Sequence, residues 1–153
     1  SQKFKHIEIA PDMKYGSVLG AKFINMVMQE GKKATAQKIV YDAFEMVQNK
    51  TKQEPLEVFE KAISEASPKV EVRPQRVGGA TYQVPREVKE KRAVSLVMRW
   101  LLKASKLKKG KPMADKLAEE ISLAIKGEGE VIKKRDAVHK MAQANKAFAY
   151  LAR

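Results

Sequence analysis

The sequence of 153 residues contains no cysteine, which excludes disulfides, thiol catalysis and thiolate metal sites. It has only two histidines, His6 and His139, and its carboxylates form no pair at metal-ligand spacing, so we expect no metal. No apolar run approaches the roughly 20 residues that span a bilayer, and the first residues lack the apolar core of a signal peptide. We therefore expect a soluble, intracellular protein that binds no membrane.

Catalytic motifs are also missing. The segment Gly31-Lys32-Lys33-Ala34-Thr35 is weakly similar to a phosphate-binding loop, but Met26 occupies the position of the first glycine of that motif. Gly127 and Gly129 lack the third glycine of a dinucleotide-binding loop. No nucleophile, base and orienting residue can be assigned together. We predict that the protein is not an enzyme and uses no cofactor.

Positive charge is abundant and unevenly distributed. The chain has 31 Lys and Arg against 18 Asp and Glu, a formal net charge of +13 and a pI near 9.9. Residues 1–72 contain 11 basic and 10 acidic side chains, whereas residues 73–153 contain 20 and 8, so the two parts carry +1 and +12. Charge that served only solubility would be spread evenly. The imbalance favours a polyanionic partner for the second half, nucleic acid first and an anionic membrane second. A membrane binder would expose an apolar face opposite its cations, and here that face is needed for the core, so no membrane partner is expected.

Helical periodicity covers most of the chain outside one central segment. We expect a single domain, residues 1–153, in which residues 1–16 form an arm across the surface of a helical body. Ser17 can cap the first helix, Thr35 can cap the second, and Pro55 suits the first turn of the third. About six helices are expected, at residues 18–30, 35–49, 55–67, 86–107, 112–127 and 136–151. The short connector between the first two helices indicates that they are antiparallel.

The central segment, residues 70–85, carries the strand signal. Val and Tyr residues flank Gly78-Gly79, a dipeptide that tolerates the positive φ angles of a tight hairpin turn. Pro74 makes the first strand an edge strand, and Arg73 and Arg76 would stand on it. We predict a mainly α, bundle-like fold with a projecting two-stranded hairpin between the third and fourth helices. A hairpin folded back over the core is the alternative.

The helix after the hairpin carries a dense run of cations. No acidic residue lies between Glu90 and Asp115, whereas eight Lys or Arg residues do. Four of these fall within an arc of about 60° on a helix and form what we call the basic ridge: Arg92, Arg99, Lys103 and Lys106. Such a ridge suits phosphates, which reward the release of counterions, and a solvated face is the alternative. Trp100, at its flank, fits the boundary of the core better than a base-stacking role.

Cations alternate with aromatic rings near the C-terminus. A stripe along the last expected helix follows Lys133-Lys134 and contains Arg135, His139, Lys146, Tyr150 and Arg153. Rings can stack on exposed bases while the cations hold phosphates, an arrangement typical of proteins that bind single-stranded or looped RNA. A lone histidine such as His139 usually has no special role, so this stripe is a weaker signal than the basic ridge.

Several strings along the chain point to one protein family. The first half contributes Pro11-Asp12, Tyr15, Lys22-Phe23-Ile24-Asn25 and Gly31-Lys32-Lys33. The hairpin contributes the run from Arg76 to Pro85, and the second half contributes Met98-Arg99-Trp100, Lys133-Lys134-Arg135, Val138-His139-Lys140-Met141-Ala142 and Ala144-Asn145-Lys146-Ala147-Phe148-Ala149. Together these strings, which run through nearly the whole chain, resemble the universal small-subunit ribosomal protein seven family in its bacterial or organellar form.

The resemblance implies a helical body with an extended β-ribbon. Such a protein binds the ribosomal RNA of the small-subunit head directly, organises assembly of that head and has no catalytic role. Its ribbon and last helix would lie near exit-site tRNA and mRNA, beside neighbouring head and platform proteins. The ribosome would be that of the bacterial cytoplasm or, alternatively, of a mitochondrion or plastid.

Charge and resemblance together nominate two sets of residues. Ribosomal RNA is expected at Lys32, Lys33, Arg73, Arg76, Arg92, Arg99, Lys103, Lys106, Lys108, Lys109, Lys111, Lys133, Lys134 and Arg135. Exit-site tRNA and mRNA are expected near Gly78, Gly79, Tyr82, His139, Lys146 and Tyr150. The chain departs from the family pattern at Gln75, where a basic residue is usual, and at Lys3, Lys5 and His6, which replace an arginine-rich arm. A helical DNA-binding regulator with its basic helix in the major groove is the alternative function.

Overall fold

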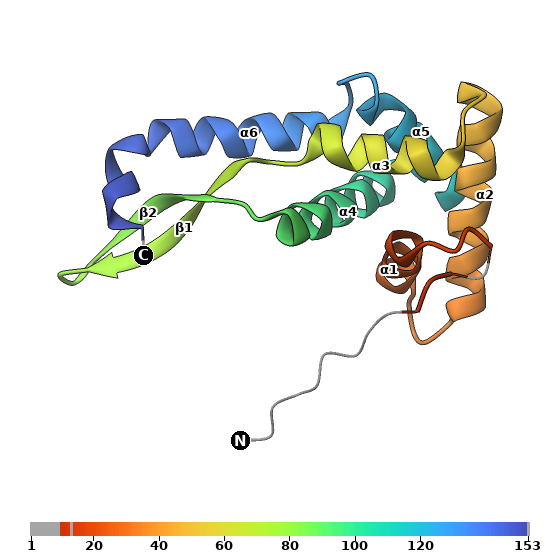
Figure 1. Ribbon diagram of the computed structural model, residues 1–153, viewed down its shortest axis with the longest axis horizontal. Helices are drawn as coiled ribbons and strands as arrows, with labels where there is room; N and C mark the ends of the chain where they lie inside the picture. The colour runs from red at the N-terminus through yellow and green to blue at the C-terminus, as the bar shows by residue number, and fades with distance from the viewer. Residues whose placement is uncertain (1–9, 13, 153) are drawn as a thin grey trace.

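A helical body and an elongated arm make up the computed structural model, which describes residues 10–12 and 14–152 (Figure 1). The body consists of α1 (Val18–Val27), α2 (Lys33–Thr51), α3 (Pro55–Ala66), α4 (Glu90–Leu107) and α5 (Met113–Ala124). The remaining elements, β1 (Val70–Val77), β2 (Ala80–Glu87), α6 (Glu130–Ala144) and the 3₁₀-helix η1 (Lys146–Leu151), form what we call the distal arm. The predicted mainly α fold, with a projecting hairpin between the third and fourth helices, is confirmed.

Aromatic side chains from three helices form the centre of the body. The ring of Phe59 lies 5.0 Å from that of Phe23 and 5.1 Å from that of Phe44, and all three side chains are fully buried. Leu101 of α4 and Leu117 of α5 complete the same core. Burying a side chain of this size contributes about 1.5–3 kcal/mol, so the periodic apolar positions of the five helices account for their assembly. No helix among residues 10–12 and 14–152 is long and apolar enough to cross a membrane.

The helix boundaries follow local signals at some ends and contradict them at others. The hydroxyl of Ser17 accepts a hydrogen bond from the backbone N–H of Gly20 at 3.0 Å, as an N-cap should, and Pro55 is the first residue of α3. The predicted cap at Thr35 is wrong, because α2 already begins at Lys33. Helix α1 ends at Val27 instead of residue 30. Residues 28–30, which were expected to be helical, instead belong to the connection between α1 and α2.

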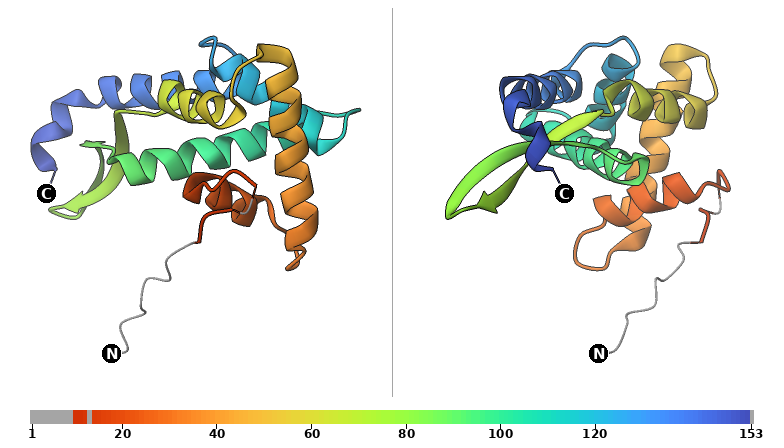
Figure 2. Two further views of the ribbon diagram at one scale, coloured as in Figure 1. Left: turned by 45° about the vertical axis from the view of Figure 1, so that its right-hand side comes forward. Right: turned by 60° about the vertical axis from the view of Figure 1, so that its left-hand side comes forward.

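Helices α1 and α2 cross steeply, so the expectation that they are antiparallel is wrong (Figure 2). The turn between them contains two successive residues with positive φ, Glu30 at 54° and Gly31 at 72°. Left-handed backbone at two consecutive positions redirects the chain sharply. The second helix therefore crosses the first within the space of a short connector.

The hairpin is longer than the sequence indicated. Gly78 and Gly79 have φ angles of 58° and 84°, as a type I′ turn requires, and the ladder runs from Val77 paired with Ala80 to Val70 paired with Glu87. Arg86 and Glu87, which were predicted to be helical, therefore belong to β2, and α4 begins at Glu90. The prediction erred here because strand pairing satisfies these backbone groups, and pairing is a tertiary property.

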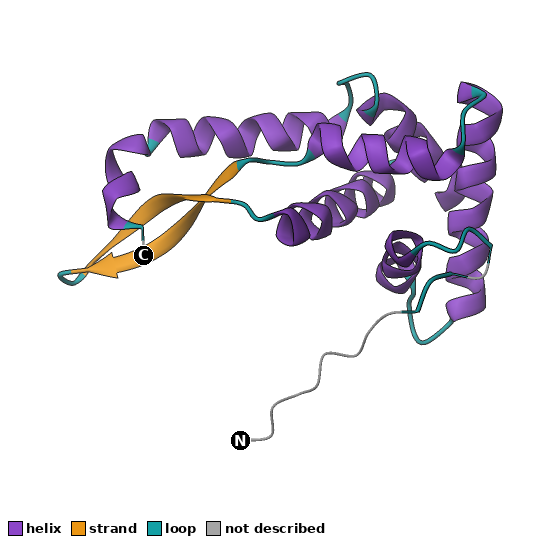
Figure 3. Ribbon diagram, viewed as in Figure 1, coloured by secondary structure: helices purple, strands orange, loops and turns teal. Residues whose placement is uncertain are grey.

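Within the distal arm, α6 and η1 support the hairpin along one side (Figures 1 and 3). Helix α6 runs beside the strands, and η1 turns down onto β2, where the ring of Phe148 lies 5.2 Å from that of Tyr82. The backbone N–H of Lys69 donates to Nε2 of His139 at 2.9 Å. The predicted continuous helix over residues 136–151 is wrong, since α6 begins at Glu130 and ends at Ala144 before the 3₁₀ turn. Helix α5 likewise ends at Ala124, earlier than residue 127.

The chain that precedes α1 is anchored by Asp12. Residues 1–9 of the expected N-terminal arm lie outside the described residues. The buried carboxylate of Asp12 accepts hydrogen bonds from the backbone N–H groups of Lys14 (3.1 Å), Tyr15 (2.7 Å) and Ser17 (2.8 Å) and from the hydroxyl of Tyr41 in α2 (3.1 Å). Burial raises the pKa of Asp12, but these hydrogen bonds outweigh it and hold the pKa below its ordinary value.

Substituting Asp12 by Asn should lower the free energy of unfolding by about 1–3 kcal/mol, because buried N–H groups lose a charged acceptor. The lowered pKa gives this contribution a direction with pH. It is fully present above the ordinary value of 3.8 and is lost as the pH falls through the folded-state pKa. Thermal denaturation across this pH range measures both effects, and Tyr41→Phe, which removes a single hydrogen bond, should cost less. An identical acid profile for the Asn variant and the parent protein would contradict this role.

Candidate nucleic-acid interface

A cation-lined hollow lies where the hairpin leads into α4. Strand β2 runs directly into this helix, so side chains of both strands converge with those of its first three turns. The cations that line the hollow are Arg73, Arg86, Lys89, Lys91, Arg92 and Arg99, together with Ser95 and a single acid, Glu87. We call this site the basic hollow. Six cations around one depression match a segment of phosphate backbone, which requires several positive charges at fixed positions.

A buried carboxylate, Glu71, holds two of these arginines in place. Its Oε1 accepts from Nε of Arg92 at 2.6 Å and from Nε of Arg73 at 3.1 Å, and its Oε2 accepts from a terminal nitrogen of Arg92 at 3.0 Å. The hydrogen bonds from Arg92 keep the pKa of Glu71 low although burial opposes this, and they raise the pKa of Arg92. The remaining N–H donors of the two guanidinium groups stay available for phosphate oxygens.

The basic ridge continues along α4 from Arg99, which lines the hollow, to Lys106. Arg99, Lys103 and Lys106 are exposed, and none forms an ion pair with another described residue. The opposite side of α4 is buried in the core, so the ridge is positioned by packing. Trp100 is half-buried against that core, which confirms its place at the core boundary.

The far end of the ridge meets the turn between α1 and α2. Lys106 and Lys32 line one shared hollow, together with residues of α5 and the start of α2. Lys32 lies 3.7 Å from Glu30 in an exposed ion pair, and Lys33 is exposed. The structure therefore brings Lys32, far from the ridge in sequence, beside the end of the ridge.

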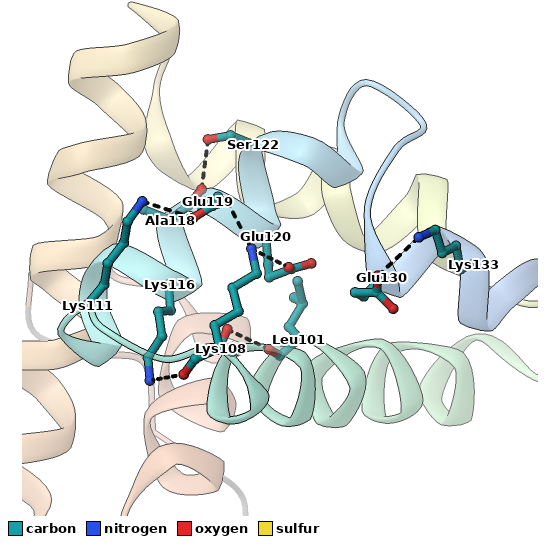
Figure 4. Close-up of polar contacts among 11 residues, drawn as sticks. Leu101, Lys108, Lys111, Lys116, Ala118, Glu119, Glu120, Ser122, Glu130 and Lys133 are labelled. Carbon is teal, nitrogen blue, oxygen red and sulfur yellow. Dashed lines mark hydrogen bonds and ion pairs between the residues drawn. The ribbon is translucent and has the colours of Figure 1, made fainter.

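Two of the lysines in the turn after α4 form ion pairs with α5. Lys108 turns inward, with its Nζ 2.7 Å from Glu120 and 3.1 Å from Glu119, both on α5 (Figure 4). Glu120 is only 1% exposed, and although burial lowers the pKa of Lys108, hydrogen bonds from it to both carboxylates raise it above its ordinary value. Lys111 also pairs with Glu119, at 3.5 Å. The segment between Glu90 and Asp115 contains no acid, but in the fold two acids of α5 pair with its lysines. Lys109 is exposed and forms no ion pair among the described residues.

The cations at the start of α6 have mixed surroundings. Lys133 pairs with Glu130 at 3.2 Å, and Lys134 is exposed. Arg135 pairs with Asp136 at 2.9 Å and also donates to the backbone carbonyl of Glu65 at 2.6 Å. Arg135 therefore joins α6 to the end of α3, in addition to any role in binding RNA.

The residues expected near tRNA and mRNA separate into two groups. Tyr82 packs on Phe148 and His139 bonds the backbone of Lys69, so both stabilise the distal arm. The surface group consists of Gly78, Gly79, Lys146 and Tyr150, the last with 79% of its surface exposed. Arg76, which was expected to contact ribosomal RNA, is also exposed. Arg153 lies outside the described residues.

Sequence reasoning missed four contributors to the basic hollow, Glu71, Arg86, Lys89 and Lys91. Lys91 lies inside the acid-free run but outside the arc of the basic ridge. Arg86 and Lys89 precede Glu90, so a search for an acid-free run began just after them. Arg86 also donates to Oε1 of Gln75 at 2.7 Å, and it lies on β2 instead of on a helix. Alternation along β2 was the signal that could have placed Arg86 on the same side as Arg73.

The fold and site define a class of protein that presents a cationic face, positioned by the core, and a supported β-hairpin. The family model described as ribosomal protein S7p/S5e matches residues 1–146. The chain belongs to this family. It is therefore a structural ribosomal protein and not an enzyme, and the DNA-binding alternative finds no support.

Similar proteins come from bacteria. A protein of Thermotoga petrophila named small ribosomal subunit protein uS7 is 56% identical over 143 residues, which cover 94% of this chain and 92% of that protein. The protein of the same name from Pseudothermotoga lettingae is 57% identical over 144 residues, covering 94% and 93% of the two chains. That of Dictyoglomus thermophilum is 56% identical over 143 residues, covering 94% and 92%.

Replacing Lys108 by Gln should lower the free energy of unfolding by about 3 kcal/mol, because the carboxylate of Glu120 would stay buried without its cation. Lys109→Gln is a matched control, and loss of this exposed charge should change stability by less than about 0.5 kcal/mol. Urea denaturation followed by circular dichroism measures both.

A second variant separates loss of the ion pair from loss of packing. Lys108→Met combined with Glu120→Leu should recover most of the stability, since an apolar pair leaves no unpaired charge. If Lys108→Gln proved as stable as Lys109→Gln, Lys108 would not be a structural cation.

Proposed function

We propose that the protein binds the ribosomal RNA of the small-subunit head through the basic hollow and the basic ridge, and thereby organises assembly of the head. The observation that carries this proposal is the set of six cations around one hollow, two of them oriented by Glu71. Family membership supports the choice of ribosomal RNA over other polyanions. The bacterial relatives favour a ribosome of the bacterial cytoplasm.

Binding in this proposal proceeds by positioning and charge neutralisation. Arginine guanidinium groups can contact two oxygens of a phosphate at once, and Arg73 and Arg92 are already held in fixed orientations. Each phosphate that is neutralised releases condensed counterions, which favours association at low salt. Arg99, Lys103 and Lys106 extend the contact along α4 as the RNA backbone passes toward Lys32 and Lys33.

The distal arm supports a second, peripheral role near exit-site tRNA and mRNA and beside the neighbouring head and platform proteins. Its tip is open, because a Cβ added at Gly78 or Gly79 would meet no atom within 4 Å. Backbone without side chains can approach another backbone closely. Tyr150 and Lys146 add an exposed ring and an exposed cation on η1.

Replacing Arg99, Lys103 and Lys106 together by Ala should weaken binding to a head-domain RNA fragment and reduce the slope of log K against log salt by about 2–3, since about three phosphate contacts are lost. Filter binding across a salt titration measures both quantities. Circular dichroism should be unchanged, because all three side chains are exposed.

The matched control replaces three exposed cations at the end of α2 and on α3 by Ala: Lys50, Lys52 and Lys61. It has the same net charge as the test variant, so it separates local contact from general electrostatic attraction. Equal losses of slope in the two triple variants would show that the ridge is not at the interface. Binding is also expected to prefer folded RNA over duplex DNA at matched salt.

Shortening the hairpin should affect tRNA more than ribosomal RNA. Deleting Arg76-Val77 and Ala80-Thr81 removes two facing pairs of the ladder and keeps both the Gly-Gly turn and Tyr82. Affinity for the head-domain RNA should fall by no more than about tenfold, as expected for one lost cation, while reconstituted subunits should retain less exit-site tRNA. Complete loss of ribosomal RNA binding would contradict this division of roles.

A further inference from the structure

An apolar groove lies between the last turns of α4 and the start of α6. Its apolar lining consists of Trp100, Ala104 and Leu107. Leu107 is 74% exposed, which is unusual for a large apolar side chain on a helix that otherwise buries its apolar face. Trp100 packs one side against the core and leaves the rest of its surface to the groove.

Two available cations stand at the rim of this groove. Lys103 and Lys134 line it and are exposed, and neither forms an ion pair within the part of the chain that the structure describes. The other charged rim residues are engaged elsewhere. Glu130 pairs with Lys133, and Lys108 turns toward α5 (Figure 4). The groove therefore combines an apolar lining with net positive charge at its rim.

We propose that this groove receives an unpaired base of the ribosomal RNA that is bound along α4. The base contacts Trp100 and Leu107, and Lys103 and Lys134 contact the phosphates on either side of it. Stacking on an aromatic ring between cations is a general way of holding an unpaired nucleotide. The inference rests on the proposed function, because it assumes that RNA occupies the ridge.

Lys103 is the reason for choosing RNA over a segment of another protein. It belongs both to the basic ridge and to the rim of the groove, so a strand that follows the ridge reaches the groove without leaving the cationic surface. An apolar protein segment would gain nothing from two unpaired lysines at the rim. The charge of the groove is thus complementary to a nucleotide and not to an uncharged peptide.

The single tryptophan of the chain provides the test, since its emission reports on the groove alone. A single-stranded oligoadenylate of about eight nucleotides, within the usual site size, should quench the emission of Trp100. An oligonucleotide of the same length and charge with abasic positions should bind by charge and leave the emission nearly unchanged. Lys134→Gln should weaken the quenching interaction severalfold, whereas Lys133→Gln, which removes a cation paired with Glu130, should have a smaller effect.

Leu107→Ser is a second variant. Because Leu107 is exposed, this substitution should not impair folding. It should also weaken quenching, with unchanged circular dichroism. Equal quenching by the adenylate and the abasic strand would overturn the proposal. So would a response of Trp100 to total small-subunit proteins but not to RNA, which would make the occupant a protein segment.

Filter binding of the head-domain RNA fragment separates this inference from the proposed function. If the fragment binds but no single strand changes the emission of Trp100, the groove proposal is wrong and the function stands. If the fragment fails to bind, the proposed function itself is wrong.

Discussion

Repulsion between like charges is the constraint on which this structure depends. Most of the excess positive charge lies in the second half of the chain, and the basic hollow gathers six cations at the junction of hairpin and body. Two buried carboxylates make this arrangement stable. Glu71 binds Arg73 and Arg92 where β1 meets α4, and Glu120 binds Lys108 where α4 meets α5. Each carboxylate offsets local positive charge and links two elements through an ion pair.

The periodic parts of the sequence predicted the architecture well. Five helices with regular apolar positions, the glycine pair of the hairpin and the exposed ridge on α4 were all expected from local pattern. Some errors were local, as at the cap of α2 and the turn before it, and the others occurred where a residue's partner lies on another element. Lys108 looked like an RNA contact because its acids come from the next helix. The start of α6 was missed because Gly129, with a φ of 91°, acts as a helix start only when Val131 and Ile132 can be buried against the body.

The supported hairpin also explains why some residues nominated for nucleic-acid contact have structural roles. A two-stranded ribbon alone is marginally stable, and this one gains support from α6 and η1. Tyr82 stacks against Phe148, and His139 accepts a hydrogen bond from the backbone of Lys69. In the sequence, Tyr82 and His139 were interpreted as residues near RNA. In the fold, both side chains form contacts within the distal arm or to the residue before it. The tip that remains exposed carries backbone and Arg76 in place of rings.

The backing of the hairpin by α6 has a consequence for the order of events during synthesis. Every residue that lines the basic hollow lies between positions 73 and 99, whereas the bonds that brace the arm to Glu65 and Lys69 come from Arg135 and His139, each 70 positions later. A nascent chain therefore contains the whole cationic surface before the brace has been translated. Capture of RNA and stiffening of the arm are separable in time, and a chain whose last helix is still unmade already carries its anchor.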